Sequence, residues 1–129
     1  MQSMNAIDIV AMIAVLQYVG FCTLVGQARG RYGIKAPAVT GHEQFERLYR
    51  VQMNTLELLV VLLPVMYASA RYWPAWAVAA AGALYVVGRI LYWRAYVGTP
   101  SKRSLGFALS LAPIFALTLA TLVAAVRGL

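Results

Sequence analysis

Acidic side chains are scarce in this sequence, and the residues that usually build disulfides and metal sites are almost missing. The 129 residues include four Asp and Glu residues, one cysteine and one histidine. A single cysteine excludes an intrachain disulfide, and Cys22 lies in an apolar run, which favours a buried, inert thiol. The sequence predicts no metal site, because His42 is the lone histidine and no cysteine cluster exists. We expect His42 to lie in a loop and to take no part in catalysis.

Hydrophobic residues, in contrast, are abundant. They make up 62% of the chain and charged residues 12%, whereas soluble domains are nearer about one half and about one quarter. The composition therefore predicts a membrane protein with one domain, residues 1–129. Four apolar stretches reach the length of roughly 20 residues that a spanning helix needs. They cover about residues 6–26, 51–70, 74–97 and 105–126. We expect an all-α membrane protein built as a four-transmembrane-helix bundle.

Basic residues outnumber acidic ones, which gives a formal net charge of +7. We assign this excess to membrane topology and not to nucleic-acid binding, because the chain has no basic soluble segment. The loops after spans one and three hold seven cations, and the opposite side holds two. They are Arg29, Arg31, Lys35, Arg47, Arg50, Lys102 and Arg103 on one side, and Arg71 and Arg127 on the other. The positive-inside rule places the first and third loops in the cytoplasm and both termini on the opposite side.

Polar residues enter the second span in a regular pattern. Arg50, Asn54 and Glu57 are spaced i, i+4, i+7, so they share one helix face. At about 1.5 Å per residue, the Glu57 carboxylate lies about 10 Å beyond Arg50 along the helix axis. This depth places a carboxylate below the membrane surface, where an ionisable group is costly unless it faces protein or water.

The third span carries a matching face. Arg89, Tyr92 and Tyr96 are spaced i, i+3, i+7, and Arg89 falls at a depth similar to that of Glu57. One interpretation is structural: Glu57 and Arg89 form an interhelical ion pair, with Asn54 as a hydrogen-bonding partner. The other is functional: these groups line a binding site that opens to one side of the membrane. The two interpretations are compatible.

Such a site would suit a small zwitterion with more than one carboxylate. Cations such as Arg50 and Arg103 would bind carboxylates, Glu57 would bind an ammonium group, and the Asn54 amide would bind a peptide group. Phosphate-binding glycine loops and nucleophile elbows are not visible in the sequence.

Two segments carry a family resemblance. "TGHEQFERLYRVQMNTLELLVVLLP", residues 40–64, and "GRILYWRAYVGTPSKRSLGF", residues 88–107, stand in matching order and spacing relative to the spans. They resemble the MAPEG family, the membrane-associated proteins in eicosanoid and glutathione metabolism, and are most similar to its bacterial members. The resemblance runs from residue 29 to residue 107. It implies a homotrimer in the bacterial inner membrane, with glutathione bound between neighbouring subunits near the cytoplasmic face.

The resemblance also implies roles for individual residues. Six residues match positions that hold glutathione within one subunit: Arg50, Asn54, Glu57, Tyr92, Tyr96 and Arg103. Two match positions that reach glutathione from the adjacent subunit: Arg29 and Gln52. Arg103 matches the arginine that stabilises the glutathione thiolate, and is thus the expected catalytic residue.

Two positions depart from the family pattern. Leu58 stands where relatives have a tyrosine or a glutamine, and Gly30 stands where leukotriene synthases have a second arginine. The pattern thus favours a glutathione transferase or peroxidase, acting on lipophilic electrophiles or lipid hydroperoxides, over leukotriene synthesis. The alternative is a non-catalytic lipid-binding scaffold of the same family. A small multidrug transporter is disfavoured, because its first span would need a central glutamate and this one has only Asp8 and Gln17.

Overall fold

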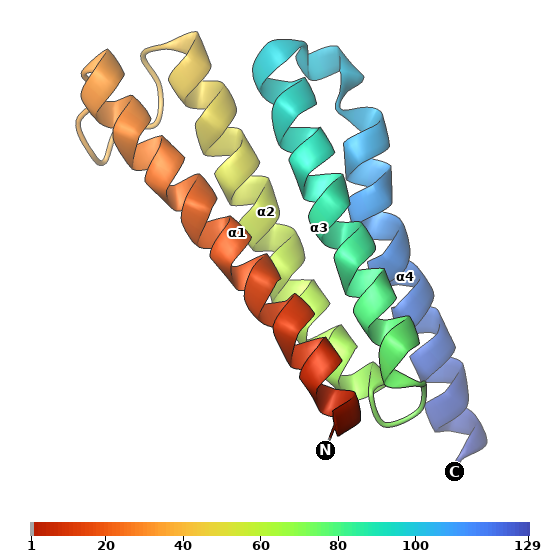
Figure 1. The fold of residues 1–129 in the computed structure, drawn as a ribbon. Coiled ribbons are helices and arrows are strands. Elements are labelled where there is room, and N and C mark those ends of the chain that lie inside the picture. The colour runs from red at the N-terminus through yellow and green to blue at the C-terminus, as the bar shows by residue number, and fades with distance from the viewer. Residues whose placement is uncertain (1) are drawn as a thin grey trace.

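The computed structural model describes residues 2–129, which form four long α-helices and one short 3-10 helix (Figure 1). The helices are α1 (Gln2–Tyr32), α2 (Glu43–Ser69), α3 (Ala75–Gly98), η1 (Pro100–Lys102) and α4 (Ser104–Arg127). Residues 2–129 contain no β-strand. All four α-helices are long and apolar enough to cross a membrane, so the predicted four-transmembrane-helix bundle is confirmed.

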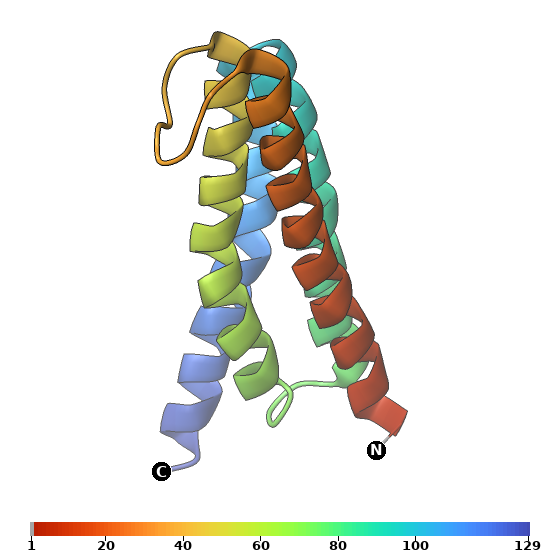
Figure 2. The same cartoon turned by 90° about the vertical axis from the view of Figure 1, so that its left-hand side faces the viewer.

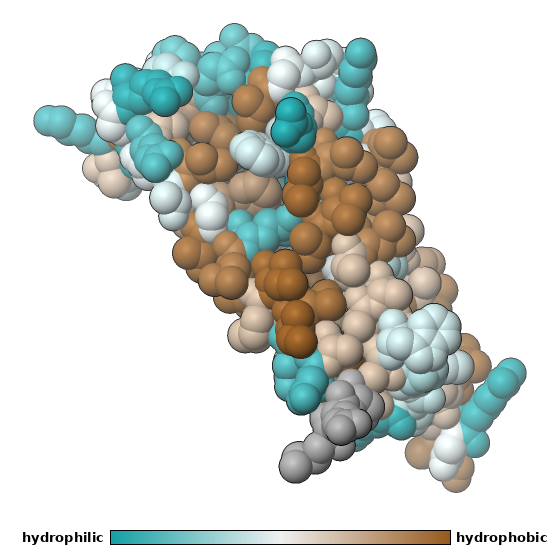
Figure 3. Space-filling model, in the orientation of Figure 1, coloured by the Kyte–Doolittle hydropathy of each residue, from teal (hydrophilic) through white to brown (hydrophobic). Residues whose placement is uncertain are grey.

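The four helices run up and down beside one another. Both termini and the α2–α3 turn lie at one end of the bundle, and the loop 33–42 and η1 lie at the other (Figures 1 and 2). We call these the terminal end and the loop end. On the face shown in Figure 3, hydrophilic side chains gather at the two ends, and most of the surface between them is hydrophobic. This is the surface pattern of a protein whose middle lies in hydrocarbon.

Two helices extend well beyond the apolar spans that the sequence predicts. α1 continues through residues 27–32 and α2 begins at Glu43, so the loop between them covers only residues 33–42 and not 27–50. Hydropathy detects the segment that crosses hydrocarbon, whereas the helix continues into water until something ends it. Gly33, with φ +69°, ends α1, and His42 caps α2 by accepting a hydrogen bond from the Gln44 backbone N–H at Nδ1.

Small residues bring α3 and α4 into direct backbone contact. A Cβ atom at Gly106 of α4 would lie 2.6 Å from the Cα of Tyr92, and a Cβ at Gly88 of α3 would lie 2.6 Å from the backbone nitrogen of Ser110. Gly106 and Ser110 are spaced i, i+4, as in the small-xxx-small pattern of close membrane helix pairs. These contacts fix the position of Tyr92 against the start of α4.

Short polar contacts tie the helices at the terminal end. The Tyr67 hydroxyl of α2 donates to the Asp8 carboxylate of α1 at 2.8 Å, and the hydroxyls of Ser69 and Thr121 join α2 to α4 at 2.7 Å. The core between the two ends is apolar and includes Leu62 and Met66 of α2. The larger polar groups of α2 and α3 therefore gather toward the loop end.

Candidate functional site

A hollow of about 480 Å³ opens between α2, α3 and the start of α4 near the loop end. It is lined by Arg50 and Asn54 of α2, Tyr92 and Tyr96 of α3, Arg103 at the η1–α4 junction, and Ser104 and Phe107 of α4. Its volume falls in the range of small-molecule sites. Five of the residues singled out in the sequence thus line one hollow, although they lie up to 53 positions apart in the chain.

Arg103 and the two tyrosines form one wall of this hollow. The rings of Tyr92 and Tyr96 lie with their centroids 5.4 Å apart, and the Arg103 guanidinium carbon lies 5.9 Å from the centroid of Tyr96. One guanidinium nitrogen of Arg103 donates to the Pro100 carbonyl at 3.0 Å, which leaves its other N–H groups for a ligand. Ser104 begins α4, so the positive end of that helix dipole also lies at the hollow.

Arg50 forms an ion pair with Glu57 of the same helix. Nη1 of Arg50 lies 3.4 Å from Oε1 of Glu57, and the two side chains are 49% and 55% exposed. The predicted common face of Arg50 and Glu57 is thus present. Asn54, between them, is buried and turned toward the other helices.

The predicted ion pair between Glu57 and Arg89 is wrong. Arg89 is fully buried, and its Nε donates to the Ser110 hydroxyl at 2.8 Å while its Nη1 donates to Asn54 Oδ1 at 2.6 Å. Among the described residues, the cation that pairs with Glu57 is Arg50. Sequence spacing gives only the axial rise between residues on one helix. It could not show that Glu57 rotates outward while Arg89 points inward, to α2 and α4.

Arg29 and Gln52 lie outside the hollow. Nη1 of Arg29 donates to the carbonyl of Ala38 at 2.7 Å, and its guanidinium lies over the Phe45 ring at 4.8 Å from the centroid. It therefore holds the loop 33–42 against the start of α2. The Gln52 amide lies against α1, where it donates weakly to the Cys22 sulfur at 3.5 Å.

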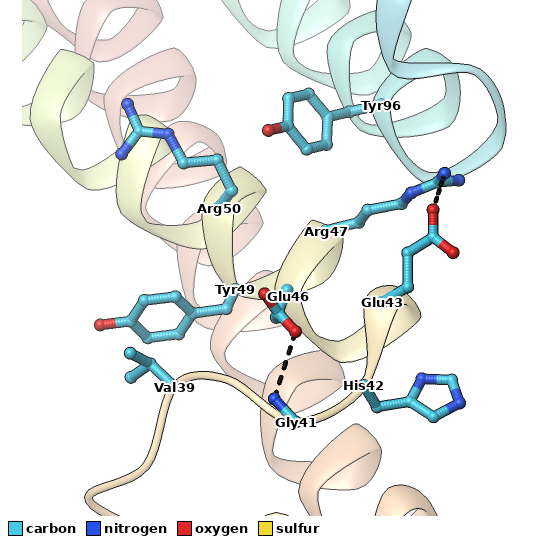
Figure 4. A pocket seen from close by; sticks show the side chains of 9 residues that line it. All are labelled: Val39, Gly41, His42, Glu43, Glu46, Arg47, Tyr49, Arg50 and Tyr96. Atoms are coloured by element: carbon cyan, nitrogen blue, oxygen red, sulfur yellow. Dashed lines mark hydrogen bonds and ion pairs between the residues drawn. The ribbon is translucent and has the colours of Figure 1, made fainter.

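A second hollow, of about 510 Å³, lies beside the first and shares Arg50 and Tyr96 with it (Figure 4). Its other charged groups are already committed to partners within the chain. Arg47 pairs with Glu43 and donates to the Val97 and Gly98 carbonyls, and Glu46 accepts a hydrogen bond from the Gly41 N–H. The first hollow differs by containing Arg103, which makes one hydrogen bond to a backbone carbonyl and keeps other N–H groups for a ligand.

Three residues near the site were not anticipated from the sequence. Ser104 and Phe107 line the hollow, and Ser110 binds Arg89 from behind it. A signal for Ser110 is present, because Gly106 and Ser110 form a small-xxx-small pair that marks the helix face packed on α3. No sequence pattern indicates that Ser104 and Phe107 line the hollow. They do so because α4 packs against α3.

The hollow has the chemistry of an anion site. Two guanidinium groups line it, from Arg50 and Arg103, and the one neighbouring carboxylate, Glu57, already pairs with Arg50. Guanidinium groups bind carboxylates with two parallel hydrogen bonds. In the described part of the chain, no three His, Cys, Asp or Glu side chains cluster in a way that could hold a metal ion.

The fold and the hollow together define an integral membrane four-helix bundle with a cationic, tyrosine-lined cleft at one end. The chain belongs to the MAPEG family, whose model matches residues 7–123. The family resemblance drawn from the two segments is therefore confirmed.

Individual relatives support the assignment. The chain is 43% identical over 101 residues to an uncharacterised protein of Synechocystis sp., covering 78% of this chain and 74% of that protein. It is 34% identical over 110 residues to microsomal glutathione S-transferase 2 of Homo sapiens, covering 85% and 75%. It is 29% identical over 107 residues to leukotriene C4 synthase of Bos taurus, covering 83% and 67%. Two of these relatives are thus named as a glutathione transferase and a leukotriene synthase.

The two departures from the family pattern lie in different surroundings. Leu58 is buried in the apolar core beside Leu59 and Leu62, so it packs the bundle and offers no polar group to the hollow. Gly30 is exposed near the end of α1, and a Cβ atom there would meet nothing within 4 Å. A larger side chain at Gly30 would therefore fit this fold.

Proposed function

We propose that this chain is a membrane-bound glutathione transferase. It would activate the glutathione thiolate for attack on lipophilic electrophiles and, with lipid hydroperoxides, act as a glutathione peroxidase. The observation that carries the proposal is the hollow in which Arg50, Asn54, Tyr92, Tyr96 and Arg103 converge. Membership of the MAPEG family and similarity to microsomal glutathione S-transferase 2 support glutathione as the co-substrate.

Glutathione has the functional groups that this hollow can bind. It is a zwitterion with two carboxylates, one ammonium group, two peptide groups and a thiol. Arg50 is placed to bind a carboxylate and Asn54 to bind a peptide group. Glu57 does not line the hollow but pairs with Arg50, which does, and we propose that it binds the ammonium group. Tyr92 and Tyr96 add phenol groups at the wall, and Arg103 remains for the thiolate.

Arg103 alone can account for the activation of the thiol. A free thiol of pKa about 8.5 is only a few per cent thiolate at pH 7. Lowering that pKa by about two units requires about 2.7 kcal/mol of preferential stabilisation of the anion. A cation about 4 Å away supplies about 4 kcal/mol at an effective dielectric constant near 20. A separate general base is therefore unnecessary.

Both proposed reactions balance without a further cofactor. In conjugation to an aryl halide, the thiolate sulfur forms a bond to the ring carbon and the halide leaves. In peroxide reduction, the thiolate attacks one peroxide oxygen, an alcohol leaves, and a second glutathione reduces the sulfenic acid to give the disulfide and water. Lipophilic substrates would reach the sulfur from the lipid along the helix surfaces, which explains the location of such an enzyme in a membrane.

The half-exposed Arg50–Glu57 pair supports the homotrimer that the family resemblance implies. Charged side chains at membrane depth are costly unless protein or water covers them. In the single chain, about half of each of these side chains is uncovered. A neighbouring subunit would cover them, and we propose that its Arg29 and Gln52 reach the bound glutathione.

We further propose the bacterial inner membrane as the location. The loop end, with most of the cations, would face the cytoplasm, and both termini would face the opposite side. This orientation gives the hollow direct access to cytoplasmic glutathione.

The test is calorimetry of the purified protein with glutathione, followed by conjugation of an aryl halide and reduction of a lipid hydroperoxide. The enzyme proposal expects heat of binding and turnover in at least one assay. Binding of lipid with no heat from millimolar glutathione would favour the non-catalytic scaffold. Proton-driven uptake of a cationic dye into vesicles would instead revive the transporter hypothesis.

A further inference from the structure

Arg89 is a buried cation for which the proposed mechanism has no use. It lies on α3 with 0% of its surface exposed, in a span that crosses hydrocarbon. Its Nε donates to Ser110 of α4 and its Nη1 to Asn54 of α2, whereas Nη2 has no hydrogen-bond partner among the described residues. An unpaired buried charge is expensive, so its retention needs a reason.

No carboxylate of this chain neutralises Arg89. The sequence holds four acidic residues, and each has another partner. Asp8 accepts from Tyr67, Glu43 pairs with Arg47, Glu46 accepts from the Gly41 N–H and Glu57 pairs with Arg50. Within the described residues no salt bridge reaches Arg89, so a bound anion is a candidate for its counter-charge.

Two residues that contact Arg89 also line the hollow. Asn54 and Tyr92 both line it, and both touch the guanidinium group, Asn54 through the 2.6 Å hydrogen bond and Tyr92 through its ring face at 4.4 Å from the centroid. Arg89 thus lies directly behind the wall of the hollow, and a bound anion would be the nearest candidate for its counter-charge.

Arg89 also decides which way the Asn54 amide points. A guanidinium group donates hydrogen bonds and accepts none, so the Asn54 atom that faces Nη1 is the carbonyl oxygen. The amide nitrogen, which can only donate, is then the group left for a ligand in the hollow. Asn54 would therefore bind an acceptor, such as a peptide carbonyl or carboxylate of the ligand, and not a ligand N–H.

We propose that Arg89 is a positioning residue of the glutathione site, which fixes the Asn54 amide as a donor and whose charge is balanced by the anionic ligand. This inference rests on the proposed function and goes beyond it. It explains why a cation without an acidic partner lies in the core of the bundle: its partner is bound only when glutathione is present.

The experiment compares three variants with the wild type in detergent micelles, by calorimetry with glutathione and by thermal unfolding with and without glutathione. Arg89→Met removes the charge at similar volume. Asn54→Asp keeps Arg89 and supplies a carboxylate partner, but removes the amide donor. Tyr85→Phe is the matched control, because it removes a buried hydroxyl that donates to the Thr55 carbonyl and does not line the hollow.

We expect Arg89→Met and Asn54→Asp each to raise the glutathione dissociation constant about tenfold or more. The unfolding temperature without ligand should stay the same or rise in both variants, since Arg89→Met removes the uncompensated buried charge and Asn54→Asp supplies a carboxylate that compensates it. The upward shift caused by glutathione should largely disappear in both, while Tyr85→Phe should keep it. A merely structural arginine would instead lower the unliganded unfolding temperature and leave the ligand-induced shift intact.

The outcomes separate this inference from the proposed function. Absence of glutathione binding by the wild type overturns the proposed function, and the positioning role falls with it. Wild-type binding that Arg89→Met retains within about threefold overturns the positioning role alone. If Arg89→Met does not fold, Asn54→Asp decides: wild-type affinity in that variant overturns the assignment of the amide as a donor.

Discussion

The guanidinium group of Arg50 lies 3.4 Å from the carboxylate of Glu57, two turns further along the same helix, and about half of each side chain is exposed. An exposed ion pair on a soluble protein contributes about 0–1 kcal/mol to stability. Here the pair lies on a helix that is apolar enough to cross a membrane, beside a cationic hollow. We therefore expect the Arg50–Glu57 pair to contribute to ligand binding and subunit assembly more than to the stability of a single chain.

Replacing Glu57 by Gln should weaken glutathione binding about tenfold, because the ligand's ammonium group loses its carboxylate. The free energy of unfolding in detergent should change by less than about 1 kcal/mol. Calorimetry and thermal unfolding measure the two effects. Glu43→Gln is the matched control, since it breaks a comparable ion pair with Arg47 outside the hollow. Equal affinities in the two variants would contradict the role of Glu57.

Replacing Arg103 by Ala should slow conjugation of an aryl halide about 20- to 30-fold at pH 7, because the bound thiol returns to a pKa near 8.5. Raising the pH to about 9 should recover most of the lost rate, since the thiol then ionises without help. A pH–rate profile, together with the ultraviolet absorbance of the thiolate, tests both statements. If Arg103→Ala equals the wild type at pH 7, Arg103 has no part in activating the thiol.

Arg29 can be tested by mixing subunits. If Arg29 acts on the glutathione of a neighbour, Arg29→Ala and Arg103→Ala should each have strongly reduced activity at pH 7 when expressed alone, and co-expression should raise it. In random trimers, about a quarter of the sites would then combine an intact Arg29 with an intact Arg103. Melting temperatures control for damage to the loop 33–42, which Arg29 holds through the Ala38 carbonyl. Failure of co-expression to restore turnover would indicate that Arg29 serves only its own subunit's loop.

Gly106→Ala should destabilise the bundle by about 3 kcal/mol, because the new methyl group would overlap the backbone of Tyr92. The same change at Gly26 of α1, where a Cβ atom meets nothing within 4 Å, should be neutral or stabilising by up to about 1 kcal/mol. Thermal unfolding in one detergent compares the two variants directly. A similar unfolding temperature for both would mean that α3 and α4 can separate at no cost.

Much of the fold follows from hydropathy, because length and apolar composition determine how many helices can span a membrane. Hydropathy does not predict where α1 ends and α2 begins, because outside the membrane the length of a helix is set by local caps such as Gly33 and His42. The site was partly predictable for a related reason. The spacing of Arg50, Asn54 and Glu57 gives their shared face and depth, and the order of the two segments gives the family.

The spacing of polar residues along α2 and α3 could not predict which residues bind Arg89. Depth along a helix axis is fixed by the rise per residue, but the rotation of each helix depends on which residues pack against its neighbours. Gly88 and Gly106 set that rotation by allowing α3 and α4 to touch, which turns Arg89 toward Asn54 and Ser110. The glycine pattern of Gly88 and Gly106 is the feature of the sequence that argues against an ion pair between Arg89 and Glu57.

Arg47 joins α2 to α3 next to the hollow, at the loop end of the bundle. It reaches from α2 to the last carbonyls of α3, at Val97 and Gly98, while Arg89 joins the same two helices seven residues deeper on α2, at Asn54. The part of α2 that carries Arg50 is therefore hydrogen-bonded to α3 on both sides of Arg50, at Arg47 and at Asn54, without any ligand. Such a preorganised frame loses little conformational entropy on binding, so most of the interaction energy with a small, flexible peptide remains available as affinity.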